Sequence, residues 1–296
     1  MIVFATSITE PKVYERCARP GIRRAAEPGS EVVANAATGS LCRSYNLILD
    51  SVAGRDDVEA LVLLHQDAEI ADPAFCARLR EALRDPDVGV VGCVGAIGVR
   101  SIAWWEGSVT WASFTHRYSE LGGGEVPGFA WNGEERPAYA RTGEVDTVDG
   151  FVLALSPWAI QNVRFDESLG VLHGYDFDLG LQVRAAGRKV VTADLQVVHH
   201  HSLRLIADEE AWMQAHMRIA EKWDGRMPNV GVAGGSWKER ARRAEAAAAV
   251  GRAREATLEM RGDARVKEVT DSLSWRITEP LRRLNAARRA FRPRQR

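Results

Sequence analysis

Short apolar runs alternate with helix-like segments over the first hundred residues. The apolar runs, typical of buried strands, occupy residues 2–8, 31–36, 60–64 and 88–99. Between them, residues 40–53 have apolar positions at helical spacing after an N-cap at Ser40, and residues 73–83 form a second predicted helix. Strands that alternate with helices at this interval predict an α/β domain with a mainly parallel central sheet.

The same alternation returns after a stretch without a clear pattern. Residues 101–144 show no regular spacing, and an irregular stretch of this length in a compact domain is usually functional or mobile. The elements expected after it are a strand at 146–156, a helix at 177–186, a strand at 189–198 with a turn-like Ala193-Asp194 inside it, and a helix at 211–223. Gly187 is the expected stop of the first of these helices.

Charge divides the chain near residue 235. Residues 236–296 contain 17 Lys and Arg against 8 Asp and Glu, whereas residues 1–235 have a net balance of −10. The basic part consists almost wholly of helix-forming residues. We therefore expect one α/β domain at 1–235 and a helical extension at 236–296, which acts as an extended arm, a coiled-coil partner or a surface-binding element.

Several functional classes are disfavoured by composition. The four cysteines have neither metal-ligand nor disulfide-framework spacing, which favours reduced thiols in a cytoplasmic protein. No signal-peptide pattern and no membrane-spanning apolar run is present, although the basic extension leaves open a peripheral contact with the inner face of the membrane. Nucleic acid is not an expected partner, because the first 235 residues are acidic and no binding motif accompanies the basic extension.

Polar residues follow the third predicted strand. His65-Gln66-Asp67 comes directly after the apolar run at 60–64, at the strand end where open α/β sheets bind ligands. A carboxylate at such a strand end suits Mn²⁺ or Mg²⁺ bound together with phosphate oxygens. A solvated loop aspartate is the alternative.

Three consecutive histidines end the strand predicted at 189–198. Because adjacent strand residues point to opposite faces, at most two of His199, His200 and His201 share a ligand-facing side. No zinc-binding spacing is present. Two interpretations stay open at this point: an imidazole ligand beside the carboxylate of the other strand end, or a core histidine beside solvated ones.

Carboxylates enter the helix predicted at 177–186. One of Asp176 and Asp178 is expected to cap the helix while the other points into a pocket, where it would act as a general base or a cation ligand. Simple capping by both is the alternative. Asp176 precedes the predicted helix and is therefore the preferred candidate for the base.

Taken together, these residues resemble a glycosyltransferase of the GT-A fold, in the family-2-like group of inverting nucleotide-sugar enzymes. The resemblance covers about residues 1–225. It includes Ser40-x4-Tyr45-Asn46, the strand-end LLHQDAEI in which HQD stands for the DxD motif, Asp149-Gly150-Phe151, HGYDFDLGLQVRAAG and the strand-end histidines.

The resemblance implies roles for individual residues. The nucleotide-diphosphate sugar is expected to contact Thr6, Ser7, Ser40, Asn46, His65, Gln66 and Asp67. The sugar and acceptor are expected to contact Asp149, Gly150, Phe151, His173, Tyr175 and Asp178. Asp67 and one of His199, His200 and His201 would ligate Mn²⁺ or Mg²⁺. Asp176 would be the base that deprotonates the acceptor hydroxyl, opposite a cation that stabilises the leaving diphosphate.

The sequence departs from the family pattern at two positions. His65 replaces the first carboxylate of DxD, which lowers the negative charge expected at the metal. Tyr175 replaces the glutamate of the usual Glu-Asp pair, so that the base depends on Asp176 alone.

The extension contains SLSWRITEPLRRL at 272–284, which resembles the SWRxTxPLR element found beside glycosyltransferase domains in bacterial surface-polysaccharide proteins. A basic amphipathic helix there would contact anionic lipid, where a lipid-linked acceptor is found. A solvated arm or an oligomerising helix is the alternative. The expected acceptor is a cell-surface glycan, an exopolysaccharide or a lipid-linked precursor.

Two other functions remain open at this point. A catalytically degenerate GT-A-like module that binds a glycan or a partner is compatible with His65. A nucleotidyltransferase would need more carboxylates and a basic loop after the first strand, where the sequence has Lys12 alone.

Overall fold

The computed structural model describes residues 1–99, 109–118, 125–127, 142–201, 208–226, 248 and 260–283. The predicted irregular stretch at 101–144 lies largely outside these residues. The chain divides into two compact units, residues 1–240 and 241–296.

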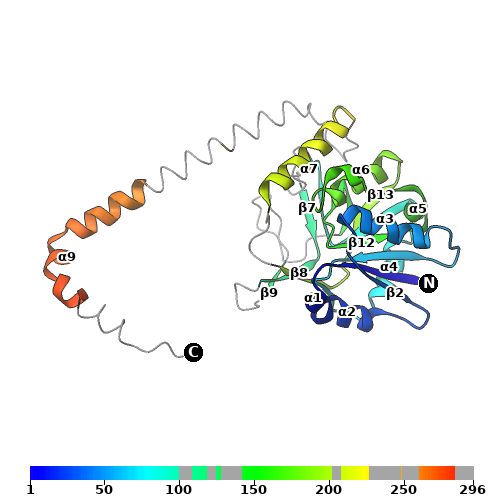
Figure 1. The fold of residues 1–296 in the computed structure, drawn as a ribbon, viewed down its shortest axis with the longest axis horizontal. Coiled ribbons are helices and arrows are strands. Elements are labelled where there is room, and N and C mark those ends of the chain that lie inside the picture. The colour runs from blue at the N-terminus through cyan, green and yellow to red at the C-terminus, as the bar shows by residue number, and fades with distance from the viewer. Residues whose placement is uncertain are drawn as a thin grey trace. The chain divides into compact units, whose positions relative to one another are not determined.

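A seven-stranded sheet forms the centre of the first unit, with strand order β10-β13-β5-β12-β3-β1-β2 (Figure 1). Its strands are β1 (Ile2–Ile8), β2 (Glu31–Ala36), β3 (Ala60–Leu64), β5 (Val88–Gly92), β10 (Gly143–Val145), β12 (Val152–Leu155) and β13 (Lys189–Thr192). Strands β1, β2, β3, β5 and β13 share one direction, whereas β12 and β10 run against their neighbours. The predicted α/β class with a mainly parallel sheet is confirmed.

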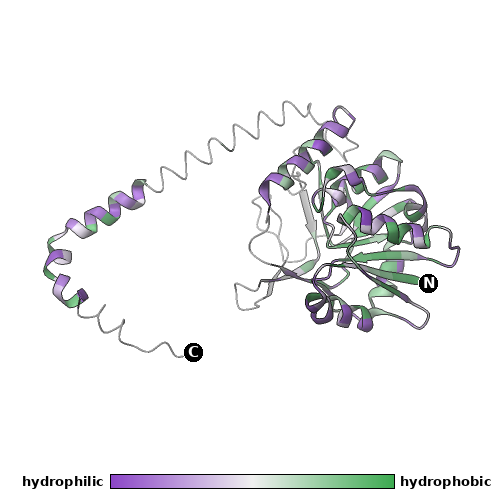
Figure 2. Cartoon of the chain, in the orientation of Figure 1, coloured by the Kyte–Doolittle hydropathy of each residue, from purple (hydrophilic) through white to green (hydrophobic). Residues whose placement is uncertain are grey.

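Helices cover both faces of this sheet because its strands are apolar on both sides (Figure 2). Along β1, Ile2 and Phe4 enter one core while Val3 and Ala5 enter the other. The first core includes residues from α1 (Pro11–Arg16), α2 (Ala18–Ala25) and α4 (Phe75–Ala82). The second includes residues from α3 (Leu41–Val52), α5 (Pro157–Asn162) and α6 (Tyr175–Ala185).

Two small sheets continue from the central one. One has the order β11-β6-β7, and the other has the order β4-β14-β8-β9. Their strands are β4 (Ala68–Ile70), β6 (Val94–Ile97), β7 (Val109–Ala112), β8 (Phe114–Tyr118), β9 (Glu125–Pro127), β11 (Thr147–Val148) and β14 (Val197–His201).

Three segments each predicted as one strand are split between sheets. Residues 88–99 form β5 and β6, residues 189–198 form β13 and the start of β14, and residues 146–156 form β11 and β12. At the second break Gln196 adopts a left-handed φ of 52°, and its amide donates to both carboxylate oxygens of Asp194. The prediction of single strands was wrong because buried residues flank each break, so the apolar pattern continues across it.

Helix α6 begins earlier than predicted. Its first residue is Tyr175, so Asp176 lies within the first turn and not before the helix. Gly174 occupies the N-cap position with a left-handed φ of 76° and supplies no side-chain cap. Gly187 follows the helix with a φ of 77°, as expected of a helix stop.

Helix α7 (Glu209–Lys222) is fixed to α6 by a buried carboxylate. Asp178 is fully buried and accepts hydrogen bonds from Lys222 Nζ at 2.9 Å and Trp223 Nε1 at 2.8 Å. Gln182, one turn further along α6, donates to the same carboxylate at 2.7 Å. These hydrogen bonds compensate for the burial of the carboxylate and hold α7 against the domain.

The described part of the second unit is helical. Residues 260–271 and 279–283 are helical, and α9 (Leu273–Ile277) begins after Ser272, whose hydroxyl accepts from Trp275 N–H. The Arg282 guanidinium lies 3.7 Å from the centre of the Trp275 ring. Among the helices that the structure describes, none is both long and apolar enough to cross a membrane.

We expect Gly174→Ala to destabilise the protein by about 2–4 kcal/mol. A Cβ at this position would collide with Ile219 Cδ1 of α7, which adds overpacking to the cost of the left-handed backbone. Gly187→Ala is the matched control, since Gly187 has nearly the same φ and a Cβ there would have no atom within 4 Å. Denaturant unfolding should show a clearly smaller loss for the control, and equal losses would contradict the packing explanation.

Candidate active site

The polar turn after β3 lies against the end of β14. Strands β4 and β14 pair in antiparallel register, with His199 opposite Ala68. The backbone N–H of His200 donates to the carbonyl of Asp67 at 2.8 Å. The ends of two strands that are far apart in sequence therefore meet at Asp67.

One carboxylate and two imidazoles form a compact cluster at this point. Ligand atoms of His65, Asp67 and His199 all lie within 4.8 Å of one another. Asp67 Oδ1 is 3.8 Å from His65 Nδ1 and 3.7 Å from His199 Nε2. The His199 ring stacks on Phe151 with the ring centres 4.5 Å apart, which fixes its orientation. This donor set is suited to a divalent transition-metal ion.

The other strand-end histidines are placed differently. His200 Nε2 lies 2.9 Å from Glu69 Oε2, outside the cluster. The side chain of His201 lies outside the described residues. Of the two neighbouring imidazoles that the structure places, His199 therefore joins Asp67, as strand alternation requires of one of them.

Tyr175 contacts the cluster through His65. Its hydroxyl oxygen is 2.6 Å from His65 Nε2, and its ring packs against Tyr45 and Phe165 with ring centres 5.9 Å and 6.0 Å away. A Cβ at Gly150 would collide with the same hydroxyl, so this position must be glycine. Burial raises the pKa of Tyr175, which keeps the phenol protonated.

A pair of carboxylates lies beside this tyrosine. Asp176 Oδ2 accepts from Gly150 N–H at 2.8 Å, and Asp149 Oδ1 accepts from Phe151 N–H at 3.2 Å. Burial raises the pKa of both carboxyl groups, and the charge on Asp176 raises the pKa of Asp149 further. A carboxylate with a raised pKa in a polar site can take a proton from a hydroxyl group.

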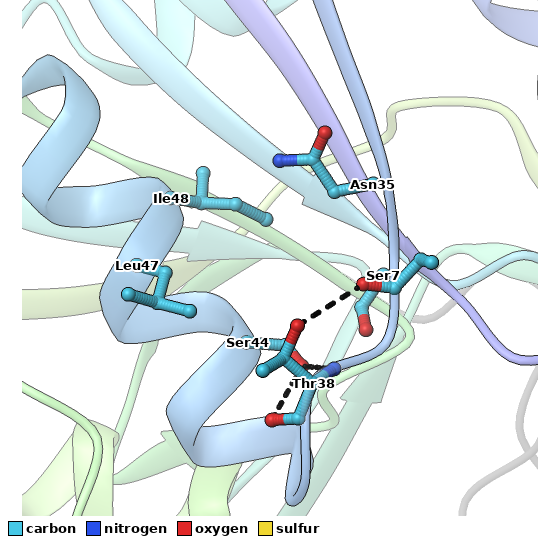
Figure 3. A pocket seen from close by; sticks show the side chains of 7 residues that line it. Ser7, Asn35, Thr38, Ser44, Leu47 and Ile48 are labelled. Carbon is cyan, nitrogen blue, oxygen red and sulfur yellow. Dashed lines mark hydrogen bonds between the residues drawn. The ribbon is translucent and has the colours of Figure 1, made fainter.

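A small pocket of about 30 Å³ opens at the carboxyl ends of β1 and β2, against α3 (Figure 3). Its lining residues are Ser7, Asn35, Ala36, Thr38, Ser44, Leu47 and Ile48. The hydroxyl of Ser7, and that of the adjacent Thr6, are buried without a hydrogen-bond partner. Buried polar groups are rarely left unpaired, and of these two residues Ser7 lines the pocket. Ser40 is the N-cap of α3, as predicted, and its hydroxyl accepts a hydrogen bond from the Arg43 N–H.

Three other predicted site residues bond to the protein itself. Gln66 accepts from the backbone N–H groups of Thr9 and Glu10 at 3.0 Å and 2.8 Å, which ties β3 to the start of α1. Asn46 exchanges two hydrogen bonds of 2.9 Å with the backbone of Phe165. Asp178 is paired with Lys222, as described above. They hold the walls of the site together.

The structure places His173 near Asp208, the N-cap of α7. His173 is half-buried, and burial lowers its pKa while the charge of Asp208 opposes that effect.

Asn35, Thr38 and Ser44 were not expected in the pocket. The available signal was that Asn35 lies near the end of β2 and Thr38 just after it, and parallel neighbours end at the same edge of a sheet.

The Glycosyltransferase like family profile matches residues 3–223, and the chain belongs to this family. The streptomycin biosynthesis protein StrF of Streptomyces griseus is 34% identical over 212 residues, which is 68% of this chain and 67% of StrF. The O-antigen biosynthesis protein RfbC of Myxococcus xanthus is 28% identical over 172 residues, which is 56% of this chain but 13% of RfbC. The predicted family is confirmed, and the protein is a glycosyltransferase.

Two solved structures are among those that match this chain. The mannosyltransferase PcManGT from Pyrobaculum calidifontis, in complex with GDP-Man and Mn²⁺, has a TM-score of 0.44 and 14% identity, covering 93% of this chain and 81% of that one. GalNAc-T7 with UDP, GalNAc and Mn²⁺ has a TM-score of 0.47 and 11% identity, covering 76% and 48%.

We expect Asp149→Asn to raise the melting temperature above neutral pH by about 2–4 °C. The pKa of Asp149 is raised in the folded protein, so its ionised form costs stability above that pKa and the cost disappears as pH falls. Asp57→Asn is a control of opposite sign, because a hydrogen bond from Arg55 lowers the pKa of Asp57 and stabilises the ionised form. Thermal unfolding at several pH values measures both, and a pH-independent gain for Asp149→Asn would contradict the electrostatic cause.

Proposed function

We propose that this glycosyltransferase moves a sugar from a nucleotide-diphosphate sugar to an acceptor hydroxyl with inversion at the anomeric carbon. The supporting observation is that Tyr175 and Gly150 connect the His65, Asp67 and His199 cluster directly to the carboxylate of Asp176. A group that can hold the leaving diphosphate and a group that can take the acceptor proton thus adjoin each other.

The donor nucleotide is proposed to bind in the pocket at the ends of β1 and β2. The unpartnered hydroxyls of Thr6 and Ser7 support a ligand with polar edges, such as a nucleobase or ribose. His65, Asp67 and His199 would hold a divalent cation. Two imidazoles with one carboxylate suit Mn²⁺ better than Mg²⁺, which prefers oxygen ligands. When bound, the ion would neutralise charge on the departing diphosphate.

Asp176 is proposed as the general base. The backbone N–H groups of Gly150 and Phe177 hold its two oxygens at 2.8 Å and 2.9 Å, which fixes the carboxylate without neutralising it. The acceptor hydroxyl gives its proton to Asp176 while its oxygen attacks the anomeric carbon. The bond to the diphosphate breaks on the opposite face, so that the configuration inverts.

The acceptor is proposed to be a hydroxyl-rich molecule of cell-surface or natural-product assembly. The names of two relatives, for O-antigen and streptomycin biosynthesis, support this class. Exposed Leu273, Ile277 and Leu281 beside basic residues of the extension support a peripheral contact with the inner face of the membrane, from a cytoplasmic location. Self-association through the same helix is the competing proposal.

Calorimetric titration with UDP-, GDP-, dTDP- and CDP-linked sugars tests the donor site. We expect one nucleotide class to bind with Mn²⁺ and to lose about tenfold or more in affinity with chelator or in Asp67→Ala. Asp56→Ala, at an exposed turn of the same domain, should bind like the wild type. Binding that is unaffected by chelator and by Asp67→Ala would contradict the proposed cation site.

Asp176→Asn should lower kcat by about 10²–10⁴-fold while donor affinity is retained. Since the pKa of Asp176 is raised, the acid limb of the wild-type rate profile should lie above the usual carboxyl range. In Asp149→Asn this limb should stay in place, because burial, and not the charge of Asp149, raises the pKa of Asp176. NMR of the product should show the inverted anomer, and a retained anomer would contradict the mechanism.

A further inference from the structure

The two positions at which the sequence departs from the family pattern touch each other in the structure. His65 and Tyr175 are 110 residues apart in sequence, yet His65 Nε2 lies 2.6 Å from the Tyr175 hydroxyl. We propose that Tyr175 is a positioning residue, which orients the His65 imidazole so that Nδ1 faces Asp67 and completes the cation site. This inference rests on the proposed function, since it assigns a role toward the cation of that site.

The two nitrogens of the His65 imidazole have different hydrogen-bonding roles. A neutral ring has one N–H donor and one nitrogen acceptor, and a metal ligand must use the acceptor. Tyr175 occupies Nε2, which leaves Nδ1 as the nitrogen 3.8 Å from Asp67 Oδ1. When a cation binds Nδ1, the ring proton resides on Nε2 and is donated to the tyrosine oxygen. Metal-bound histidines generally donate their second nitrogen in this way.

The surroundings of Tyr175 fix the position of its hydroxyl. The ring is held between Tyr45 and Phe165, and Asn46 clamps the backbone of Phe165 with two hydrogen bonds. Gly150 leaves space for the hydroxyl, where any Cβ would collide with it. Each contact restricts where the hydroxyl can go, so the hydroxyl in turn restricts His65.

The charge balance of the site explains why a neutral pair fits here. Asp67, Asp149 and Asp176 already bring three carboxylates into this region, and their negative charges repel one another. An imidazole and a phenol add ligand and positioning groups without adding negative charge. His65 and Tyr175 therefore act as one unit, in which the second departure from the family pattern supports the first.

Mn²⁺ binding by Tyr175→Phe tests this role. Unbound Mn²⁺ is counted by electron paramagnetic resonance during titration with MnCl₂, alone and with UDP, GDP, dTDP or CDP. Tyr175→Phe keeps the packed ring and should bind Mn²⁺ about 10–100-fold more weakly than the wild type. Tyr45→Phe is the matched control, because it removes a neighbouring hydroxyl that is buried without a hydrogen-bond partner. The control should bind like the wild type.

A double-mutant comparison shows whether Tyr175 acts through His65. In a His65→Ala background, Tyr175→Phe should cause no further loss of Mn²⁺ affinity. An equal further loss in that background would overturn the inference in favour of a general structural effect, and so would wild-type affinity in Tyr175→Phe. If the wild type binds no Mn²⁺ under any of these conditions, the cation site of the proposed function fails and this inference fails with it.

A second measurement uses the wild type alone and is independent of how the variants fold. Histidine-selective ¹⁵N NMR with the diamagnetic ion Zn²⁺ reports which ring nitrogen of His65 carries the proton. We expect the proton on Nε2 and the metal on Nδ1. A zinc-bound His65 with its proton on Nδ1 would overturn the assignment.

Discussion

The close approach of α6 to residues 147–150 is the constraint on which the rest of the site depends. A Cβ at Gly150 would collide with the Tyr175 hydroxyl, and a Cβ at Gly180 would lie 2.8 Å from Thr147 Oγ1. Helix α6 therefore packs directly against the backbone of residues 147–150. That approach lets Asp176 accept the Gly150 N–H and lets Tyr175 reach His65. A helix displaced by one side-chain layer would separate Asp176 and Tyr175 from the cluster of His65, Asp67 and His199.

Much of the central domain follows from local sequence, because buried strands and amphipathic helices leave an apolar signature. The runs that became β1, β2 and β3, the Ser40 cap and the Gly187 stop were predictable for that reason. The breaks within 88–99 and 146–156 were not, since a buried strand looks the same in either sheet, whereas the turn-like Ala193-Asp194 lies at the break within 189–198. The start of α6 was also missed, because its N-cap is a left-handed glycine without a capping side chain.

The candidate site, like the fold, was predictable from the sequence only in part. Strand alternation indicates that adjacent histidines point to opposite faces of the sheet, but it does not say which histidine points to which face. Only the pairing of His199 with Ala68 places His199 beside Asp67. Gln66 and Asn46 bind partners 56 to 121 residues away, which no local pattern reveals. The contact between His65 and Tyr175 also joins residues that are far apart in sequence, so no local pattern predicts it, although both residues depart from the family pattern.

The buried carboxylate of Asp178 also bears on where the catalytic domain ends. Its partners Lys222 and Trp223 are the last residue of α7 and the residue after it, and the family profile ends at residue 223 as well. A fragment that stopped short of them would leave the fully buried carboxylate of α6 without these partners. A fragment designed to keep the Asp178 carboxylate paired must therefore include Trp223.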